Sequence, residues 1–113
     1  MHSTDPIDFE HLRRYTFGDQ ALEKEILGLF LTQLPETMAL LKAATSERDW
    51  KIAAHTLKGS SRAVGAARLA DIAQMAESLA ASPDQAAKDD ALLQLEAAAA
   101  EARTFIENTY QGR

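Results

Sequence analysis

Apolar residues recur every three or four positions in four long stretches of the chain, and this spacing limits the possible folds more than any other feature. A side chain returns to the same face of an α-helix after three or four residues, so each stretch predicts a helix with one buried side. No apolar-polar alternation and no Asn-Gly hairpin turn is present, as strands would require. The sequence therefore predicts an all-α protein. The longest stretch carries Leu22, Ile26, Phe30, Leu34, Met38 and Leu41.

Capping residues set the expected ends of the first two helices. Asp8 can cap a short helix from Phe9 to about Phe17, and Asp19 can cap the long second helix. Aspartate suits these positions because it accepts hydrogen bonds from the free N–H groups of a helix start. Pro35 lies inside the second helix, where it removes one backbone hydrogen bond. Because the apolar stripe continues beyond it, we expect the proline to kink the helix, or only to remove that bond, rather than to end the helix.

Three turns separate the remaining helices. The polar run of residues 45–49 leads into the third helix, a turn near Gly65 and Ala66 leads into the fourth, and Ser82-Pro83 ends the fourth. Short connections favour antiparallel neighbours, so we expect an up-down-up-down antiparallel four-helix bundle with a short extra N-terminal helix. The expected inner faces are Leu69, Ile72, Ala73, Ala76 and Leu79 in the fourth helix, and Leu92, Leu95, Ala99, Ala102, Phe105 and Ile106 in the last.

Length and composition fit one core of this kind. The chain has 113 residues, of which 46% are hydrophobic, so we expect a single domain at residues 8–110 behind a flexible tail of residues 1–7. Without cysteine it has neither disulfides nor thiolate metal sites. A net charge of -5 argues against nucleic-acid binding. No apolar run approaches the roughly 20 residues of a membrane span. We expect a cytoplasmic monomer that binds neither nucleic acid nor membranes.

One face of the third helix is basic and carries a histidine. Lys51, His55, Lys58 and Arg62 fall within a wedge of roughly 60° at 100° per residue. His55 is therefore expected to face solvent. Such a face would attract a phosphate or an acidic partner, although a basic helical face is more often only solvated. The opposite face carries apolar or small residues, namely Trp50, Ala53, Leu57, Ser60, Ser61 and Val64.

Gly59 lies one turn after His55 on nearly the same face. Glycine inside a helix costs about 1 kcal/mol relative to alanine, so some advantage must offset it. One interpretation is access, because missing bulk beside an imidazole lets a partner approach. The other is that Gly59 serves helix packing or a kink.

The run AAHTLKGSSRAVGA resembles the signature of the histidine-containing phosphotransfer (HPt) domain family, roughly His-x-Leu-Lys-Gly-Ser-Ser followed by Gly-Ala. The resemblance continues into the helices on either side and covers most of the chain, from about Asp8 to Tyr110. It departs at Arg62-Ala63, where many members carry a small residue and then asparagine, so any role of that asparagine is missing here. The matching residues are His55, Leu57, Lys58, Gly59, Ser60, Ser61, Gly65 and Ala66.

The resemblance implies a phosphocarrier of a two-component phosphorelay rather than an enzyme. His55 would take a phosphoryl group from a receiver-domain aspartate, or from a sensor or hybrid histidine kinase, and pass it to another response-regulator receiver. The receiver would supply Mg²⁺, so no cofactor is expected in this chain. Phosphoryl transfer also needs charge compensation and room for the donor, which Lys58 and Gly59 could supply.

The partner would rest on the residues around His55. Lys51, Ile52 and Arg62 are the expected contacts, because Ile52 offers an exposed apolar side chain and the other two offer positive charge. The outer side of the second helix would complete the docking face.

The imidazole needs a group that holds its proton on one nitrogen. If the helices on either side of Gly65-Ala66 run antiparallel, facing positions sum to about 132. This places Glu77 opposite His55, with Gln74 one turn away. Either could accept the imidazole N–H, and the family resemblance favours Glu77. The alternative is that both are ordinary solvated side chains.

Two other functions remain open from the sequence. The protein could be a helical adaptor that binds signalling partners without phosphorylation. A hydrolase using His55 as a general base is a poorer interpretation, because no serine, cysteine or metal site converges on it by spacing. The sequence has no nucleotide-binding glycine loop. Any phosphoryl group must therefore come from another protein.

Overall fold

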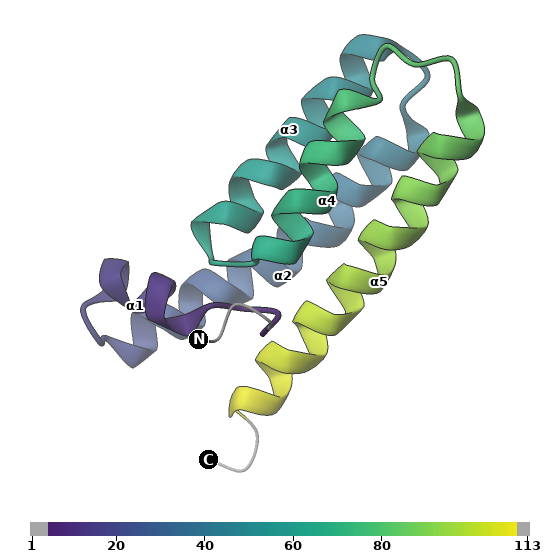
Figure 1. The fold of residues 1–113 in the computed structure, drawn as a ribbon. Helices are drawn as coiled ribbons and strands as arrows, with labels where there is room; N and C mark the ends of the chain where they lie inside the picture. The colour runs from purple at the N-terminus through teal and green to yellow at the C-terminus, as the bar shows by residue number, and fades with distance from the viewer. Residues whose placement is uncertain (1–4, 111–113) are drawn as a thin grey trace.

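The computed structural model describes residues 5–110, in which every regular element is a helix. The all-α prediction is therefore confirmed for this part of the chain. Figure 1 shows α3 and α4 side by side, with α2 and α5 beside them and the short α1 at one end. The elements are α1 (Phe9–Thr16), α2 (Gln20–Ala43), α3 (Glu47–Ala63), α4 (Ala67–Ser78) and α5 (Gln85–Tyr110).

Side-chain caps begin the first three helices. Asp8 accepts from the backbone N–H of His11 at 3.2 Å, and Asp19 accepts from that of Leu22 at 3.1 Å, so both predicted caps are confirmed. Ser46 caps α3 by accepting from the backbone N–H of Asp49 at 3.1 Å. The third helix therefore starts within the polar run that we expected to form the turn, because a serine cap and early acidic residues favour a helix start.

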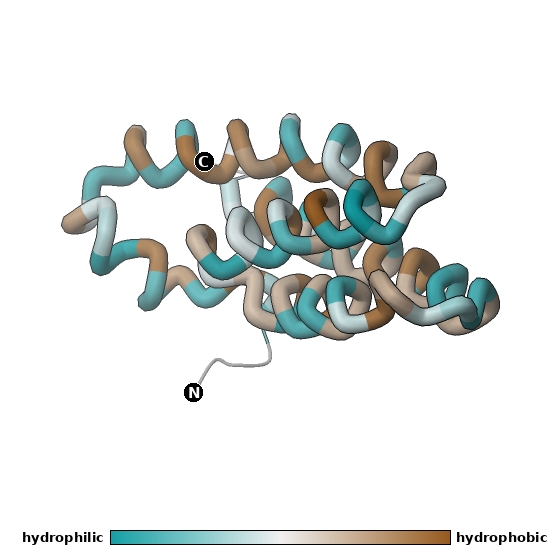
Figure 2. The backbone as a smooth tube through the Cα atoms, turned by 90° about the horizontal axis from the view of Figure 1, so that it is seen from above, coloured by the Kyte–Doolittle hydropathy of each residue, from teal (hydrophilic) through white to brown (hydrophobic). Residues whose placement is uncertain are grey.

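The core lies between the apolar faces of the helices, and in Figure 2 brown and teal segments alternate along them. The third, fourth and last helices bury the faces that the sequence indicates. Leu57, Ala73 and Leu95 are each 0% exposed. In α2, by contrast, Leu22 of the expected apolar stripe is 38% exposed, while its neighbour Glu23 is 2% exposed.

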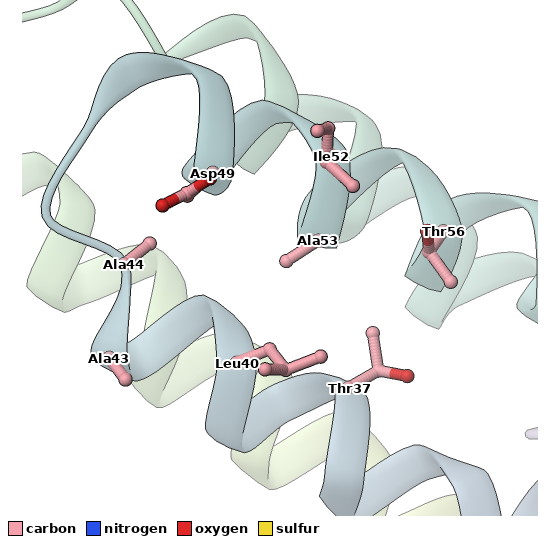
Figure 3. A pocket seen from close by; sticks show the side chains of 8 residues that line it. All are labelled: Thr37, Leu40, Ala43, Ala44, Asp49, Ile52, Ala53 and Thr56. Carbon is pink, nitrogen blue, oxygen red and sulfur yellow. The ribbon is translucent and has the colours of Figure 1, made fainter.

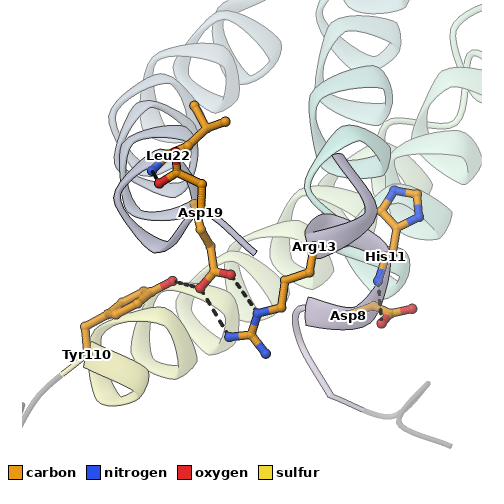
Figure 4. Close-up of polar contacts among 7 residues, drawn as sticks. Asp8, His11, Arg13, Asp19, Leu22 and Tyr110 are labelled. Atoms are coloured by element: carbon orange, nitrogen blue, oxygen red, sulfur yellow. Dashed lines mark hydrogen bonds and ion pairs between the residues drawn. The ribbon is translucent and has the colours of Figure 1, made fainter. Parts of the chain in front are cut away.

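Glu23 is buried because it has partners on two other helices. Its carboxylate accepts from Arg13 Nε at 2.7 Å and from Arg13 Nη2 at 3.3 Å. The hydroxyl of Tyr110, the last residue of α5, donates to the same carboxylate (Figure 4). A carboxylate can be buried only when such donors replace water. The cluster ties together α1, α2 and the end of α5.

Pro35 lies inside α2 without ending it, as expected. A proline has no N–H, so the carbonyl four residues earlier, that of Leu31, loses its helical partner. Arg103 of α5 replaces that partner, since its Nη2 donates to the Leu31 oxygen at 2.9 Å. The defect in α2 thus becomes a polar contact with α5.

The segment before α1 packs against the turn between α3 and α4. The Asp8 N–H donates to the Gly65 oxygen at 2.9 Å. Gly65 has a φ of +80°, and a Cβ there would lie 2.8 Å from the Asp8 oxygen, so only glycine fits. Ile7 is 1% exposed, so the prediction of a flexible tail through residue 7 was wrong for Ile7, whose apolar side chain joins the core. Residues 1–4 lie outside the described part.

The other two histidines have different settings. His11 is partly buried, and its Nε2 atom is enclosed. The ring lies edge-on to Tyr15, with 5.4 Å between the ring centroids. His2 lies outside the described residues.

Within residues 5–110, none of the helices combines the length and the apolar character needed to cross a membrane.

Candidate functional site

His55 lies in the middle of α3 with its side chain 67% exposed. The helix turns its opposite face inward, where Ala54 and Leu57 are both 0% exposed. Burial of that apolar face fixes the rotation of α3, and this rotation directs the imidazole outward. The expected exposure of His55 is confirmed.

The carboxylate of Glu77, on α4, lies beside the imidazole. Glu77 Oε2 is 3.1 Å from His55 Nδ1, and the Glu77 side chain is 13% exposed. The contact joins the middle of α3 to the end of α4. This is the pairing expected if the two helices run antiparallel. An ionised carboxylate only accepts hydrogen bonds, so this contact requires the imidazole proton on Nδ1. The nitrogen left unprotonated in the neutral ring is Nε2.

The surroundings of Glu77 keep it ionised. Its pKa lies below its ordinary value, chiefly because it accepts a hydrogen bond from Lys58 and also because it accepts one from His55. Burial acts in the opposite direction, since it disfavours the charged form. The hydrogen bonds from Lys58 and His55 outweigh the effect of burial on the pKa. Glu77 is therefore ionised at neutral pH, and it can accept a hydrogen bond from the imidazole.

Lys58 points toward α4 rather than into solvent. Its Nζ lies 2.7 Å from Glu77 Oε1 and 3.0 Å from Gln74 Oε1, and its side chain is 12% exposed. Lys58 and His55 therefore bind the two oxygens of one carboxylate. Gln74 contacts Lys58, not the imidazole. Of the two acceptors considered from the sequence, only Glu77 contacts His55.

Gly59 is exposed, and a Cβ added there would meet nothing within 4 Å. No close neighbour therefore requires a glycine at this position, and the packing interpretation has no support from contacts. Lys51 and Arg62 are also exposed. Within residues 5–110 neither forms an ion pair, so both charges face solvent near the imidazole.

A groove of about 290 Å³ lies between α2 and α3, next to this face (Figure 3). Two large apolar side chains on its rim are exposed, Leu40 at 67% and Ile52 at 53%. Most of the remaining lining is small or apolar. The groove is lined by Thr37, Leu40, Ala43, Ala44, Asp49, Ile52, Ala53 and Thr56.

Sequence reasoning named Ile52 but not Leu40 or Thr37 as parts of this surface. A signal was present for Leu40, because it directly precedes Leu41 of the buried stripe and so points about 100° away from it. A leucine off the apolar stripe of an amphipathic helix is exposed. The pairing of Gln74 with Lys58 also had a signal, because 58 and 74 sum to 132, the value expected for facing positions on these two helices.

A scan against protein-family models matches the Hpt domain model to residues 25–105, more than half of the chain. The chain belongs to the Hpt domain family. Hpt domains carry out histidine phosphotransfer in phosphorelays, as phosphocarriers without an ATP site. No significant match was found among curated proteins or among solved structures. Within residues 5–110 this Hpt domain has no group of three histidine, cysteine, aspartate or glutamate side chains that could hold a metal ion.

Proposed function

We propose that this Hpt domain carries its phosphoryl group on Nε2 of His55. The observation that supports the proposal is the contact between Glu77 Oε2 and His55 Nδ1 at 3.1 Å on an imidazole that is 67% exposed. The carboxylate holds the proton on Nδ1 and leaves the lone pair of Nε2 for attack. Exposure lets that nitrogen reach a group on another protein.

The transfer is an in-line displacement at phosphorus. The Nε2 lone pair of His55 attacks the phosphorus of an aspartyl phosphate, and the bond from phosphorus to the aspartate oxygen breaks to release a carboxylate. The imidazole gains positive charge while Nδ1 keeps its proton. Glu77 stabilises that charge, since a carboxylate within hydrogen-bond distance favours the cation. The reverse displacement returns the phosphoryl group to a second aspartate.

Lys58 has two roles in this proposal. Its ammonium neutralises Glu77, which would otherwise repel the incoming phosphoryl oxygens. It also stands one helical turn from His55, close enough to compensate charge on those oxygens in the transition state. Gln74 holds the ammonium on this side of α3.

The partner docks over the groove beside His55. Leu40 and Ile52 offer apolar contact, and Gly59 leaves the surface next to the imidazole open. Lys51 and Arg62 surround the site with positive charge, which suits an acidic aspartate pocket and speeds encounter at low salt. The partners are receiver domains of response regulators and a sensor or hybrid histidine kinase. The receiver provides the Mg²⁺ of the transfer.

The remaining expectations about the chain belong to the same proposal. Residues 8–110 act as one domain, and α2 to α5 form an up-down-up-down antiparallel bundle, which the short α2–α3 and α3–α4 connections support. The protein works as a cytoplasmic monomer, without binding nucleic acid or membranes.

The test is transfer of radioactive phosphate from a panel of phosphorylated receivers to the wild-type protein and to His55→Gln. We expect the wild type alone to be labelled, and the label to be lost in acid and stable in base, as a phosphoramidate is. The variant should unfold at the same temperature as the wild type because His55 is exposed. Label on a folded His55→Gln protein would contradict the assignment. A wild type that binds receivers but takes no label would favour an adaptor.

A further inference from the structure

Trp50 forms a buried hydrogen bond from α3 to α4. Its indole Nε1 donates to the backbone oxygen of Ala76 at 2.6 Å. Trp50 is 4% exposed and Ala76 is 0% exposed, so water cannot replace the bond. Ala76 directly precedes Glu77, the residue that contacts His55.

Glu77 occupies a weak place in its helix. It is the penultimate residue of α4, which ends at Ser78, and the last turn of a helix lacks four intrahelical hydrogen-bond donors. A negative charge at a helix C-terminus also opposes the helix dipole, and α4 has no basic residue in its last turn. The Ala80 N–H donates to the Glu77 oxygen at 3.1 Å, and a further contact from another helix would reduce the fraying that is usual at helix ends.

The hydrogen bond from Trp50 of α3 supplies such a contact at Ala76, one residue before Glu77. The Ala76 oxygen already accepts from the Leu79 N–H at 3.0 Å, in the tightened end of the helix, and the indole adds a donor from α3. Lys88 of α5 places its Nζ 5.3 Å from the centre of the Trp50 ring. The indole therefore also contacts a cation of α5.

We propose that Trp50 is a positioning residue for His55. Its indole N–H fixes the last turn of α4, and that turn keeps the Glu77 carboxylate on Nδ1 of the imidazole. Loss of the N–H lets the turn move, so His55 shifts toward the tautomer with the proton on Nε2. The effect on phosphoryl transfer rests on the function proposed above, whereas the effect on the tautomer does not.

The test replaces the N–H of Trp50 while keeping its shape. Trp50 is the only tryptophan of the chain, so an analogue with a benzothiophene ring, in which sulfur replaces N–H, enters at this position alone. Long-range ¹H–¹⁵N spectra of the histidines, recorded in mildly alkaline buffer, report the tautomer of the neutral ring. The His55→Gln spectrum assigns the signal, and the transfer rate from a phosphorylated receiver is measured on the same samples.

We expect the wild type to hold the proton on Nδ1, and the analogue protein to show a larger share of the Nε2-protonated form with a several-fold slower transfer. In a Glu77→Gln background the analogue should cause no further change in transfer. Trp50→Phe, which keeps an aromatic ring without a donor, should behave like the analogue. Ile106→Val, a buried change on α5, controls for destabilisation alone and should leave the tautomer unchanged.

Two results would overturn the inference. One is a folded analogue or phenylalanine protein with the wild-type tautomer. The other is an equal tautomer shift in Ile106→Val. A tautomer that responds to Trp50 in a protein that takes no phosphoryl group would instead contradict the proposed function and leave the positioning role standing.

Discussion

Gly59 offers a test in which stability and function should change in opposite directions. Glutamine at this position replaces the worst helix former after proline with one of the better ones, a gain of roughly 0.5 kcal/mol for an exposed helix interior. No cost offsets the gain, because an added Cβ meets nothing within 4 Å. For a domain of this size the gain corresponds to a rise in melting temperature of about 2 °C.

The same side chain should obstruct the partner. Residues four apart on a helix have Cβ atoms about 5–6 Å apart, so the glutamine stands beside the imidazole of His55. The reacting nitrogen and phosphorus must approach to about 3–3.5 Å, and a displacement of about 1 Å can cost a hundredfold in rate. We therefore expect transfer from a phosphorylated receiver to fall by about a hundredfold or more in Gly59→Gln, measured by the rate of label transfer alongside thermal unfolding.

Gly28 provides a matched control. It also lies in a helix, is exposed, and has nothing within 4 Å of an added Cβ. It lies nine residues from Thr37 of the groove, about 14 Å along α2. Gly28→Gln should give the same stabilisation with unchanged transfer. A Gly59→Gln protein that is more stable and transfers at the wild-type rate would refute the access argument, and one that is clearly less stable would show that Gly59 is needed for packing.

Three further predictions concern polar contacts. Lys58→Ala should slow transfer about tenfold, equivalent to about 1.4 kcal/mol, without abolishing it, and an unchanged rate at low salt would refute the role of Lys58. Glu77 has a lowered pKa in the folded protein, so it contributes on the order of 1 kcal/mol to the free energy of unfolding. This contribution is present above the ordinary pKa of 4.5 and is lost as the pH falls below it. In urea unfolding, Glu77→Gln should therefore lose less stability in acid than the wild type, and equal losses would refute the pairing. Arg103→Leu should lower the free energy of unfolding by about 0.5–1 kcal/mol. The loss should be much smaller in a Pro35→Ala background, because residue 35 then donates to the Leu31 oxygen again. An equal loss in both backgrounds would show that the contact is incidental.

Features that depend on neighbours in sequence could be predicted, and features that depend on distant partners could not. The caps at Asp8 and Asp19 and the outward direction of His55 follow from local hydrogen bonding and helical spacing. The burial of Glu23 does not, since it requires Arg13 and Tyr110 to meet at one point from different helices. The periodicity of α2 indicated Leu22 for the inner face, and the ion pair overrode it.

The candidate site shows the same division at closer range. Antiparallel spacing brought Glu77 and Gln74 near His55, but it could not separate them, because both lie on the face of α4 toward α3. The side chain of Lys58 separates them. Its ammonium takes the amide oxygen of Gln74 and one oxygen of Glu77, which leaves the second oxygen of Glu77 for the imidazole.

This division of one carboxylate also resolves an electrostatic conflict in the site. In the proposed transfer, a carboxylate beside His55 favours the required tautomer and the cationic product, yet it repels the phosphoryl oxygens that must come close. The conflict would be strong for a bare carboxylate, because Glu77 and Lys58 are both largely shielded from water. Pairing with Lys58 removes most of the repulsion while the oxygen facing His55 keeps its ability to accept. The arrangement therefore needs the lysine on α3 and the glutamate on α4 together, and it depends on whatever holds the end of α4 in place.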